Sequence, residues 1–127
     1  MLKLCRIDIE RSEEIFGKIK KYAELVVEKL KPHCIILFGS FATADINEGS
    51  DVDIIVIADF KEPFLERIKV LLDLNDALNL PLEPIGYTPE EFLRMKDEEN
   101  PFIQEVLLNG KVLYGKIPEV SRKEGEL

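Results

Sequence analysis

The chain has 127 residues, a length that can bury one hydrophobic core without disulfide bonds. Its 17 Lys and Arg residues against 25 Asp and Glu residues give a net charge of −8 at pH 7, which argues against general nucleic-acid binding and favours a basic partner. No run approaches the roughly 18 uninterrupted apolar residues of a membrane span, and the charged start of the chain does not fit a secretory signal, so we expect a cytoplasmic protein.

The first expected element is an amphipathic helix that ends before Pro32. Apolar residues recur at helical spacing from Ile15 to Leu30, and Ser12 is the candidate N-cap. The pattern predicts a helix from Ser12 to the residues before Pro32, with one face packed on the core.

Two short apolar runs, residues 35–38 and 54–57, are typical of buried strands, and a polar loop joins them. The loop opens with Gly39 and Ser40. A glycine that leaves a strand lets a ligand approach the backbone closely, and the N–H groups of the turn that follows can hold phosphate oxygens. This turn is therefore a candidate phosphate-binding site.

Asp51 and Asp53 stand at the start of the second strand. Because successive side chains on a strand face opposite ways, both carboxylates point to the same side, roughly 6.5 Å apart along the backbone. Such a pair beside apolar residues is self-repelling and poorly solvated unless a hard cation such as Mg²⁺ neutralises it. A metal-binding pair facing a phosphate-binding turn suits phosphoryl or nucleotidyl transfer.

The second half of the chain predicts three more helices and two more strands. In chain order these are a helix from Glu62–Pro63 to about Leu78, a strand within residues 80–87, a helix with a capping box at Thr88–Glu91, a helix from Asn100 to Leu108, and a strand at 112–114. The fold class implied is α/β, with a small mixed sheet, helices against one or both faces, and the metal site at the strand ends.

The stretch FGSFATADINEGSDVD resembles the hallmark of the minimal nucleotidyltransferases (MNT) of the DNA polymerase β superfamily, closely over residues 38–57 and loosely over 80–93. The resemblance implies one nucleotidyltransferase-like domain over residues 1–127, and neither a repeat nor a linker suggests a second. Residues 121–127 are polar, so we expect them to be a frayed tail. It implies ATP or another NTP as substrate and Mg²⁺ or Mn²⁺ as cofactor. The residues implied for nucleotide binding are Gly39, Ser40 and Ser50, and those implied for metal binding and catalysis are Asp51, Asp53 and Glu83.

Glu83 is the candidate for the third carboxylate that the family carries on a later strand. The family more often has Asp at this position, and Pro81 and Pro84 flank Glu83 here. The alternative is an exposed glutamate on an edge strand, since proline within sheets is largely confined to edges and bulges.

The resemblance implies an enzyme that transfers NMP, AMP from ATP foremost, to a protein hydroxyl. Such proteins are commonly paired, as antitoxins, with a small helical HEPN-type toxin, and a homodimer is a further arrangement. The family often has a basic residue soon after the Gly-Ser pair, whereas this chain has none over residues 41–44; Arg6, Lys61 or Lys111 could substitute. The alternative functions are therefore a catalytically weak or inactive module that neutralises a partner by binding it, and a nucleotide or metal sensor.

Overall fold

The protein is described here by a computed structural model that covers residues 2–39, 42 and 51–119, with side chains from residue 13 onward within these ranges. The elements follow in the order α1 (Leu2–Leu30), β1 (Cys34–Phe38), β2 (Val52–Ile57), α3 (Phe64–Asp73), β3 (Leu82–Tyr87), α4 (Pro89–Asp97), α5 (Pro101–Asn109) and β4 (Lys111–Gly115). The predicted frayed tail, Ser40 and Ser50 lie outside the described residues. None of the helices in the described part is both long and apolar enough to cross a membrane.

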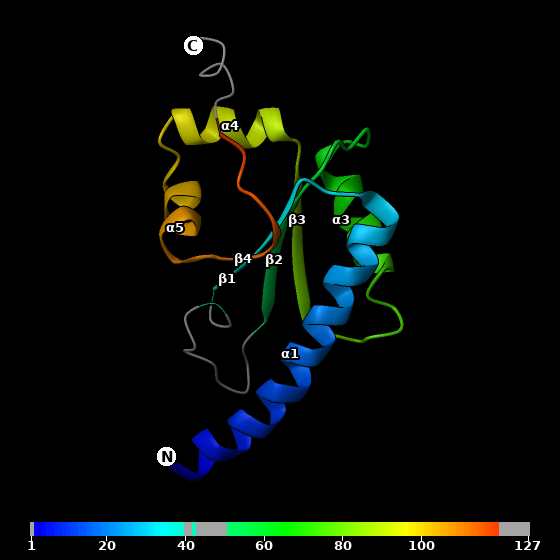
Figure 1. Ribbon diagram of the computed structural model, residues 1–127, viewed down its shortest axis with the longest axis vertical. Coiled ribbons are helices and arrows are strands. Elements are labelled where there is room, and N and C mark those ends of the chain that lie inside the picture. Colours follow the sequence, from blue (N-terminus) through cyan, green and yellow to red (C-terminus); the bar gives the residue numbers. More distant parts are fainter. Residues whose placement is uncertain (1, 40–41, 43–50, 120–127) are drawn as a thin grey trace.

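The four strands form one mixed sheet in the order β3-β2-β1-β4. β1 is antiparallel to both β2 and β4, while β2 and β3 are parallel and are connected through α3 (Figure 1). Parallel neighbours need such a crossover connection, whereas antiparallel neighbours do not. The predicted small mixed sheet, with the helix after residue 62 crossing to the Glu83 strand, is confirmed.

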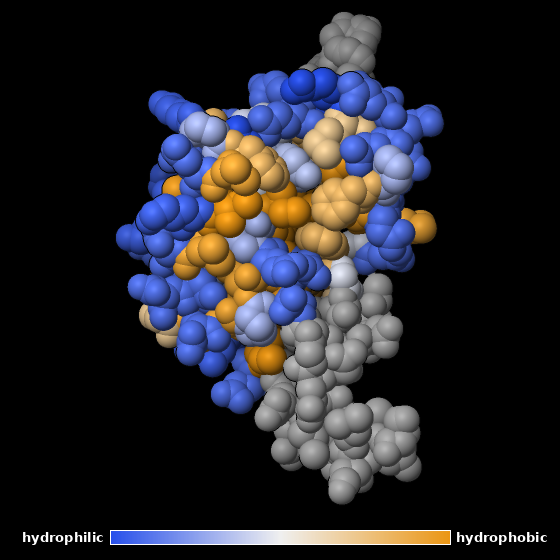
Figure 2. Space-filling model, turned by 180° about the vertical axis from the view of Figure 1, so that it is seen from behind, coloured by the Kyte–Doolittle hydropathy of each residue, from blue (hydrophilic) through white to orange (hydrophobic). Residues whose placement is uncertain are grey.

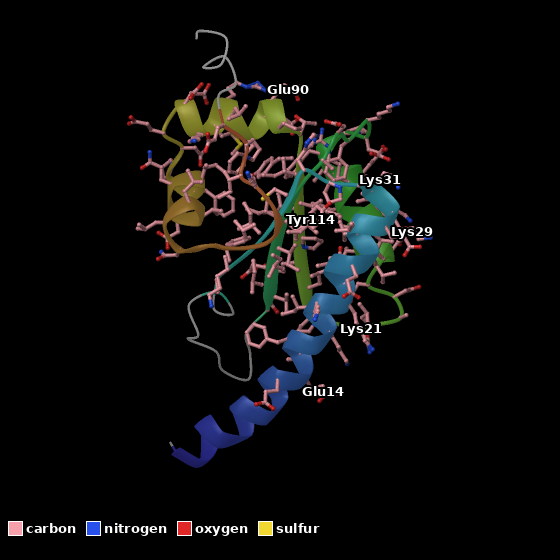
Figure 3. All side chains as sticks on the ribbon, in the orientation of Figure 1. Glu14, Lys21, Lys29, Lys31, Glu90 and Tyr114 are labelled. Atoms are coloured by element: carbon pink, nitrogen blue, oxygen red, sulfur yellow. The ribbon has the colours of Figure 1, made fainter. Side chains whose placement is uncertain are left out.

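Helices cover both faces of the sheet because its central strands are apolar on both sides. On one face, Ile35, Leu37, Ile54 and Val56 pack against Tyr22 and Val26 of α1 and Leu71 of α3. On the other face, Ile36, Ile55 and Ile57 pack against Phe92 of α4 and against Ile103 and Val106 of α5. The charged side chains of α1 that Figure 3 labels, including Lys21 and Lys29, are exposed on its outer side.

Two predicted helix boundaries were wrong. The first helix begins at Leu2 rather than at Ser12, because residues 2–11 contain no Gly or Pro that would stop a helix, and a serine is tolerated in its interior. The helix after Pro63 ends at Asp73 rather than near Leu78. There the Asn75 side chain donates a hydrogen bond to the Leu80 carbonyl (2.8 Å) and accepts one from the Leu80 N–H (2.9 Å), which favours a turn over further helix.

The two predicted caps in the second half are confirmed. The Thr88 hydroxyl accepts from the Glu91 N–H at 3.2 Å, and the Glu91 carboxylate accepts from the Thr88 N–H at 2.9 Å, which together form a capping box for α4. Asn100 Oδ1 accepts from the N–H groups of Phe102 and Ile103, and so fixes the start of α5. These caps set where α4 and α5 lie on the sheet.

Candidate functional site

The site residues on three strands lie in one row across the sheet. Phe38 of β1 pairs in register with Asp53 of β2, and Asp53 pairs with Glu83 of β3. Directly paired residues on neighbouring strands point to the same face. The row therefore presents an aromatic ring and two carboxylates on the face that α4 and α5 cover.

Asp53 and Glu83 meet because β2 and β3 are parallel and in register at their N-terminal ends. Burial raises the pKa of Asp53 to about 6, and a side-chain hydrogen bond with Glu83 and the negative charges of Glu83 and Asp51 raise it as well. Two carboxylates that face each other in a partly buried position cannot both ionise at low cost. The pair therefore either shares a proton or is suited to a cation.

Asp51 is the third carboxylate of the predicted metal site. It is exposed, directly before β2, and its charge contributes to the raised pKa of Asp53. Within the described residues, no group of three His, Cys, Asp or Glu side chains is arranged around a common metal position. The structure thus brings two of the three predicted carboxylates together and leaves Asp51 at the surface beside them.

Gly39 ends β1 next to Asp53. Its φ is +77°, a conformation that L side chains rarely adopt. A Cβ built on Gly39 would collide with the Oδ2 oxygen of Asp53. The Ala42 N–H donates to the Gly39 carbonyl at 3.0 Å and closes the turn. A glycine is therefore required here so that the turn can lie against the carboxylate.

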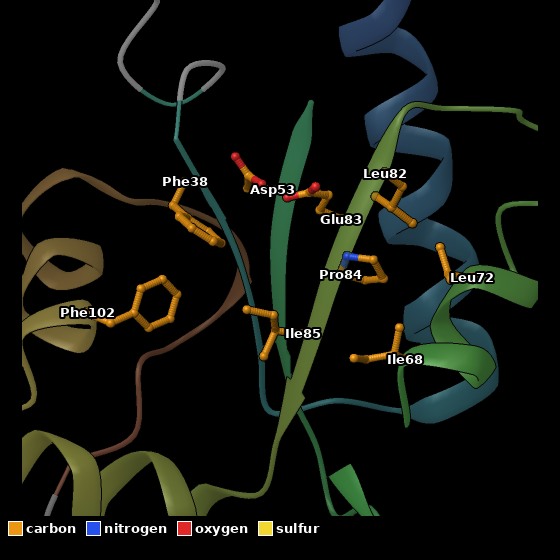
Figure 4. Close-up of a pocket in the computed structure, with 9 residues that line it drawn as sticks. All are labelled: Phe38, Asp53, Ile68, Leu72, Leu82, Glu83, Pro84, Ile85 and Phe102. Atoms are coloured by element: carbon orange, nitrogen blue, oxygen red, sulfur yellow. The ribbon is translucent and has the colours of Figure 1, made fainter. Parts of the chain in front are cut away.

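A cavity of about 500 Å³ opens beside the carboxylate pair (Figure 4). β3 runs along it. On one side lie Phe38, Phe102 and Ile85 with Asp53 and Glu83, and on the other lie Leu82, Pro84, Ile68 and Leu72. The face of the molecule seen in Figure 2 carries apolar side chains at its middle, bordered by hydrophilic residues. The pair is thus flanked by an apolar, open cavity.

The sequence had not singled out Phe102 or Ile85 as site residues. Phe102 is 5.4 Å from Phe38, measured between ring centroids, with the two rings edge to face. The local pattern indicated only that Phe102 begins a helix, because its place over β1 depends on how α5 packs. No signal in the sequence pairs these two rings.

The two described lysines that could substitute for the missing basic residue lie away from the pair of Asp53 and Glu83. Lys61 follows the C-terminal end of β2, whereas Asp53 lies near its N-terminal end. Lys111 pairs with Leu37, whose side chain packs on the α1 face of the sheet, so Lys111 is on the face opposite to Asp53. The side chain of Arg6 lies outside the described residues.

Comparisons with known proteins agree on one family. The family described as polymerase beta, nucleotidyltransferase matches residues 18–119. A protein of Methanocaldococcus jannaschii, named as a candidate protein adenylyltransferase, is 32% identical over 100 residues, which cover 76% of this chain and 94% of that protein.

Two solved structures resemble the fold. A crystal structure of a toxin–antitoxin complex with AMP-PNP matches with a TM-score of 0.57 and 25% identity, over 79% of this chain and 73% of that one. A structure of tri-AMPylated Shewanella oneidensis HEPN toxin in complex with MNT antitoxin matches with a TM-score of 0.54 and 21% identity, over 88% and 77% of the two chains. At that identity the second likeness shows the fold alone.

Proposed function

This chain belongs to the polymerase β nucleotidyltransferase family, and on this premise we propose that it is a Mg²⁺-dependent enzyme that transfers AMP from ATP to a hydroxyl group of a partner protein. Its α/β fold is nucleotidyltransferase-like, as predicted, and resembles that of MNT antitoxins. The observation that carries the proposal is the carboxylate pair of Asp53 and Glu83 against the Gly39 turn. The name of the Methanocaldococcus jannaschii relative supports a protein as acceptor.

The donor set fits a divalent cation. Asp53 and Glu83 offer carboxylate oxygens, the ligands that Mg²⁺ and Mn²⁺ prefer, and Asp51 lies within two residues as a further oxygen donor. The raised pKa of Asp53 has the physical cause that a cation would remove, namely uncompensated negative charge in a partly buried position. When bound, Mg²⁺ would supply positive charge that offsets the negative charge developing on the phosphates during transfer.

The residues of the chain have separate roles in this scheme. Gly39 carries no side chain, so the turn can lie against the Asp53 carboxylate. Ser40 and Ser50 are proposed to hold phosphate oxygens through backbone N–H and hydroxyl groups. The acceptor oxygen forms a bond to the α-phosphorus as the bond to pyrophosphate breaks. Glu83 is exposed on an edge strand, so an acceptor hydroxyl can donate a hydrogen bond to its carboxylate during the attack.

We propose a HEPN-type toxin as the partner, with the present chain as its antitoxin. The support is the fold shared with a solved complex of an MNT antitoxin and a HEPN toxin, and the net charge of −8, which favours a basic partner. A homodimer is compatible with this arrangement. The reaction requires ATP and Mg²⁺, so we expect it to take place in the cytoplasm.

The test is transfer of label from [α-³²P]ATP to a HEPN-type protein encoded beside this chain, with Mg²⁺ present. Wild type should label the partner, and Glu83→Gln should reduce the labelling rate by at least about 100-fold, because it removes a carboxylate needed for turnover. Glu90→Gln, which changes an exposed glutamate on α4, is the matched control and should label at the wild-type rate.

The alternative is a binding module that neutralises its partner without chemistry. It is favoured by the absence of a basic residue over 41–44 and by the positions of Lys61 and Lys111 away from Asp53. In that case wild type and Glu83→Gln would bind and neutralise the partner equally, and neither would transfer label. Undiminished label transfer by Glu83→Gln would instead remove Glu83 from the mechanism.

A further inference from the structure

Phe38 and Phe102 give the cavity an aromatic wall that the proposed chemistry does not use. Both rings line the cavity and both are only partly buried, although rings of this size are commonly packed away from solvent. They meet edge to face, at an angle of 81° between the ring planes. In such a pair the ring that offers its edge keeps both of its faces free of the other ring, so a third flat group can stack there.

The position of this wall relative to the carboxylates suits a nucleotide. Phe38 pairs in register with Asp53 and directly precedes Gly39 of the candidate phosphate turn. Neighbouring strands are about 4.8 Å apart, so the wall lies one strand away from the site of phosphate and metal binding. Phe102 contacts Phe38 from α5, on the same side of β3 as Asp53 and Glu83.

The lining of the cavity offers little that could read a base by hydrogen bonds. Among the described lining residues, the only polar side chains are those of Asp53 and Glu83, which the proposed function assigns to metal binding and catalysis. The remainder of the described lining is aliphatic, aromatic or proline. Because the described part of the lining offers no further hydrogen-bonding side chains, it discriminates weakly between ligands of similar shape.

We propose that Phe102, with Phe38, stacks on the base of the substrate nucleotide, and that this stacking site discriminates little between bases. The inference rests on the proposed function, since it takes the phosphates to lie at Gly39 and the metal at Asp53. Stacking on an aromatic side chain tolerates every base because each has a π-face. We therefore expect Mg-ATP, Mg-GTP, Mg-CTP and Mg-UTP to bind within about tenfold of one another.

The chain contains no tryptophan, which allows a direct test. Phe102→Trp introduces a single indole at the proposed stacking position, and its fluorescence should be quenched when Mg-ATP binds. By calorimetry, Phe102→Leu, which keeps an apolar group but loses the ring, should weaken binding of Mg-ATP by about 5- to 100-fold. Phe64→Leu makes the same change to a ring on α3 that packs beside Tyr87 and is not among the described lining of the cavity. It is the matched control and should bind Mg-ATP as wild type does. Thermal melting shows that each variant is folded.

The possible outcomes distinguish the stacking site from the proposed transferase function. Wild-type affinity for Mg-ATP in Phe102→Leu, or an unquenched Phe102→Trp that calorimetry shows to bind, would overturn the stacking site and leave the transferase proposal intact. A preference of more than about tenfold for ATP over the other three nucleotides would overturn the lack of discrimination. Failure of wild type to bind any of the four would overturn the inference and the proposed function together.

Discussion

Asp53 carries a stability cost in the absence of metal, and this cost depends on pH. Its pKa is raised to about 6, from about 4 in an unfolded chain. The folded state therefore holds the proton more tightly, so the favourable contribution is complete below about pH 4 and is lost as the pH rises through about 6. We expect Asp53→Asn to melt at a higher temperature than wild type at pH 7.5 in EDTA, and the difference to shrink at pH 4.5.

Two comparisons make this prediction specific. Asp97→Asn changes an exposed aspartate on α4 and should melt like wild type at both pH values. Added Mg²⁺ should raise the melting temperature of wild type but not that of Asp53→Asn. If Asp53→Asn melts at the wild-type temperature at both pH values, the carboxylates of Asp53 and Glu83 do not repel each other in solution.

Gly39 and Gly17 form a matched pair for testing the turn. An alanine at Gly39 meets both an unfavourable positive φ and the carboxylate of Asp53, whereas a Cβ at Gly17 in α1 meets nothing within 4 Å. Gly17→Ala should stabilise the protein by up to about 1 kcal/mol through helix propensity, and Gly39→Ala should destabilise it by about 1 kcal/mol or more. Urea unfolding gives both values. Equal effects of the two substitutions would mean that Gly39 has no special conformational role.

The positions of the site residues could be predicted from the sequence only where the strand pattern determines them. The family resemblance indicated Glu83, and the helix between the two apolar strands predicted a crossover from the Asp53 strand to the Glu83 strand. The contact between the two carboxylates depends on the register, which only the structure shows. The predicted grouping of Asp51 with Asp53 depends on the backbone conformation before β2, which strand alternation does not determine, and in the described residues Asp51 completes no group of three carboxylates with them. Phe102 could not be placed at all, since its contact with Phe38 is decided by the docking of α5.

Among the elements, α3 differs most from its predicted pattern. The apolar spacing of this helix predicts that Phe64 and Leu72 face inward, yet their side chains are 40% and 41% exposed, while Arg67 between them is only 6% exposed. Helical periodicity finds apolar stripes, so it overlooked a charged residue whose partners come from other elements. Arg67 donates to the Glu62 carbonyl at 2.7 Å, to the Gly86 carbonyl at 3.1 Å, and to the Glu91 carboxylate at 2.7 and 3.1 Å.

These bonds connect α3, the end of β3 and the start of α4, at the opposite end of the sheet from Asp53. Arg67→Ala would leave two carbonyls without this donor and the Glu91 carboxylate without its partner, so we expect a loss of about 2 to 3 kcal/mol in the free energy of unfolding. Lys69→Ala breaks only an exposed pair with Asp73 in the same helix and should cost no more than about 0.5 kcal/mol. Similar costs for both would show that the Arg67 network contributes no more than a surface pair.

The same network predicts sensitivity to acid. The hydrogen bond from Arg67 holds the pKa of Glu91 below its ordinary value, despite an opposing effect of burial. The stabilisation from the ionised Glu91 carboxylate is therefore complete above the pKa of an unfolded glutamate, near 4.3. It is lost as the pH falls through the pKa of Glu91 in the folded protein. Glu91→Gln should thus lose stability at pH 7 relative to wild type, and this difference should narrow below about pH 4 in urea titrations. A difference that stays constant with pH would indicate that the carboxylate charge is not responsible.

At the scale of the whole molecule, the order of the strands determines how accessible the carboxylate pair is. β3 is an edge strand, so Glu83 is exposed while Asp53, one strand further in, is partly buried. Pro84 in β3 has no N–H to offer another strand, which reduces the tendency of this edge to pair with further chains. The carboxylate pair therefore lies between the covered part of the sheet and its open edge, which is the side from which the proposed partner would approach.

The net charge of −8 should govern how fast this partner arrives. Opposite charges on two proteins accelerate their encounter, and salt screens this effect, because the Debye length falls from about 10 Å at 0.1 M to about 3 Å at 1 M ionic strength. If the partner is basic, we expect its association rate constant to fall at least about tenfold between 50 mM and 500 mM NaCl, with a much smaller change in the dissociation rate constant. Stopped-flow measurements over a salt series give both constants, and duplex DNA, which the acidic chain should not bind, is the control. An association rate that does not change with salt would show that the partner is recognised by apolar contacts and hydrogen bonds, and the expectation of a basic partner would be wrong.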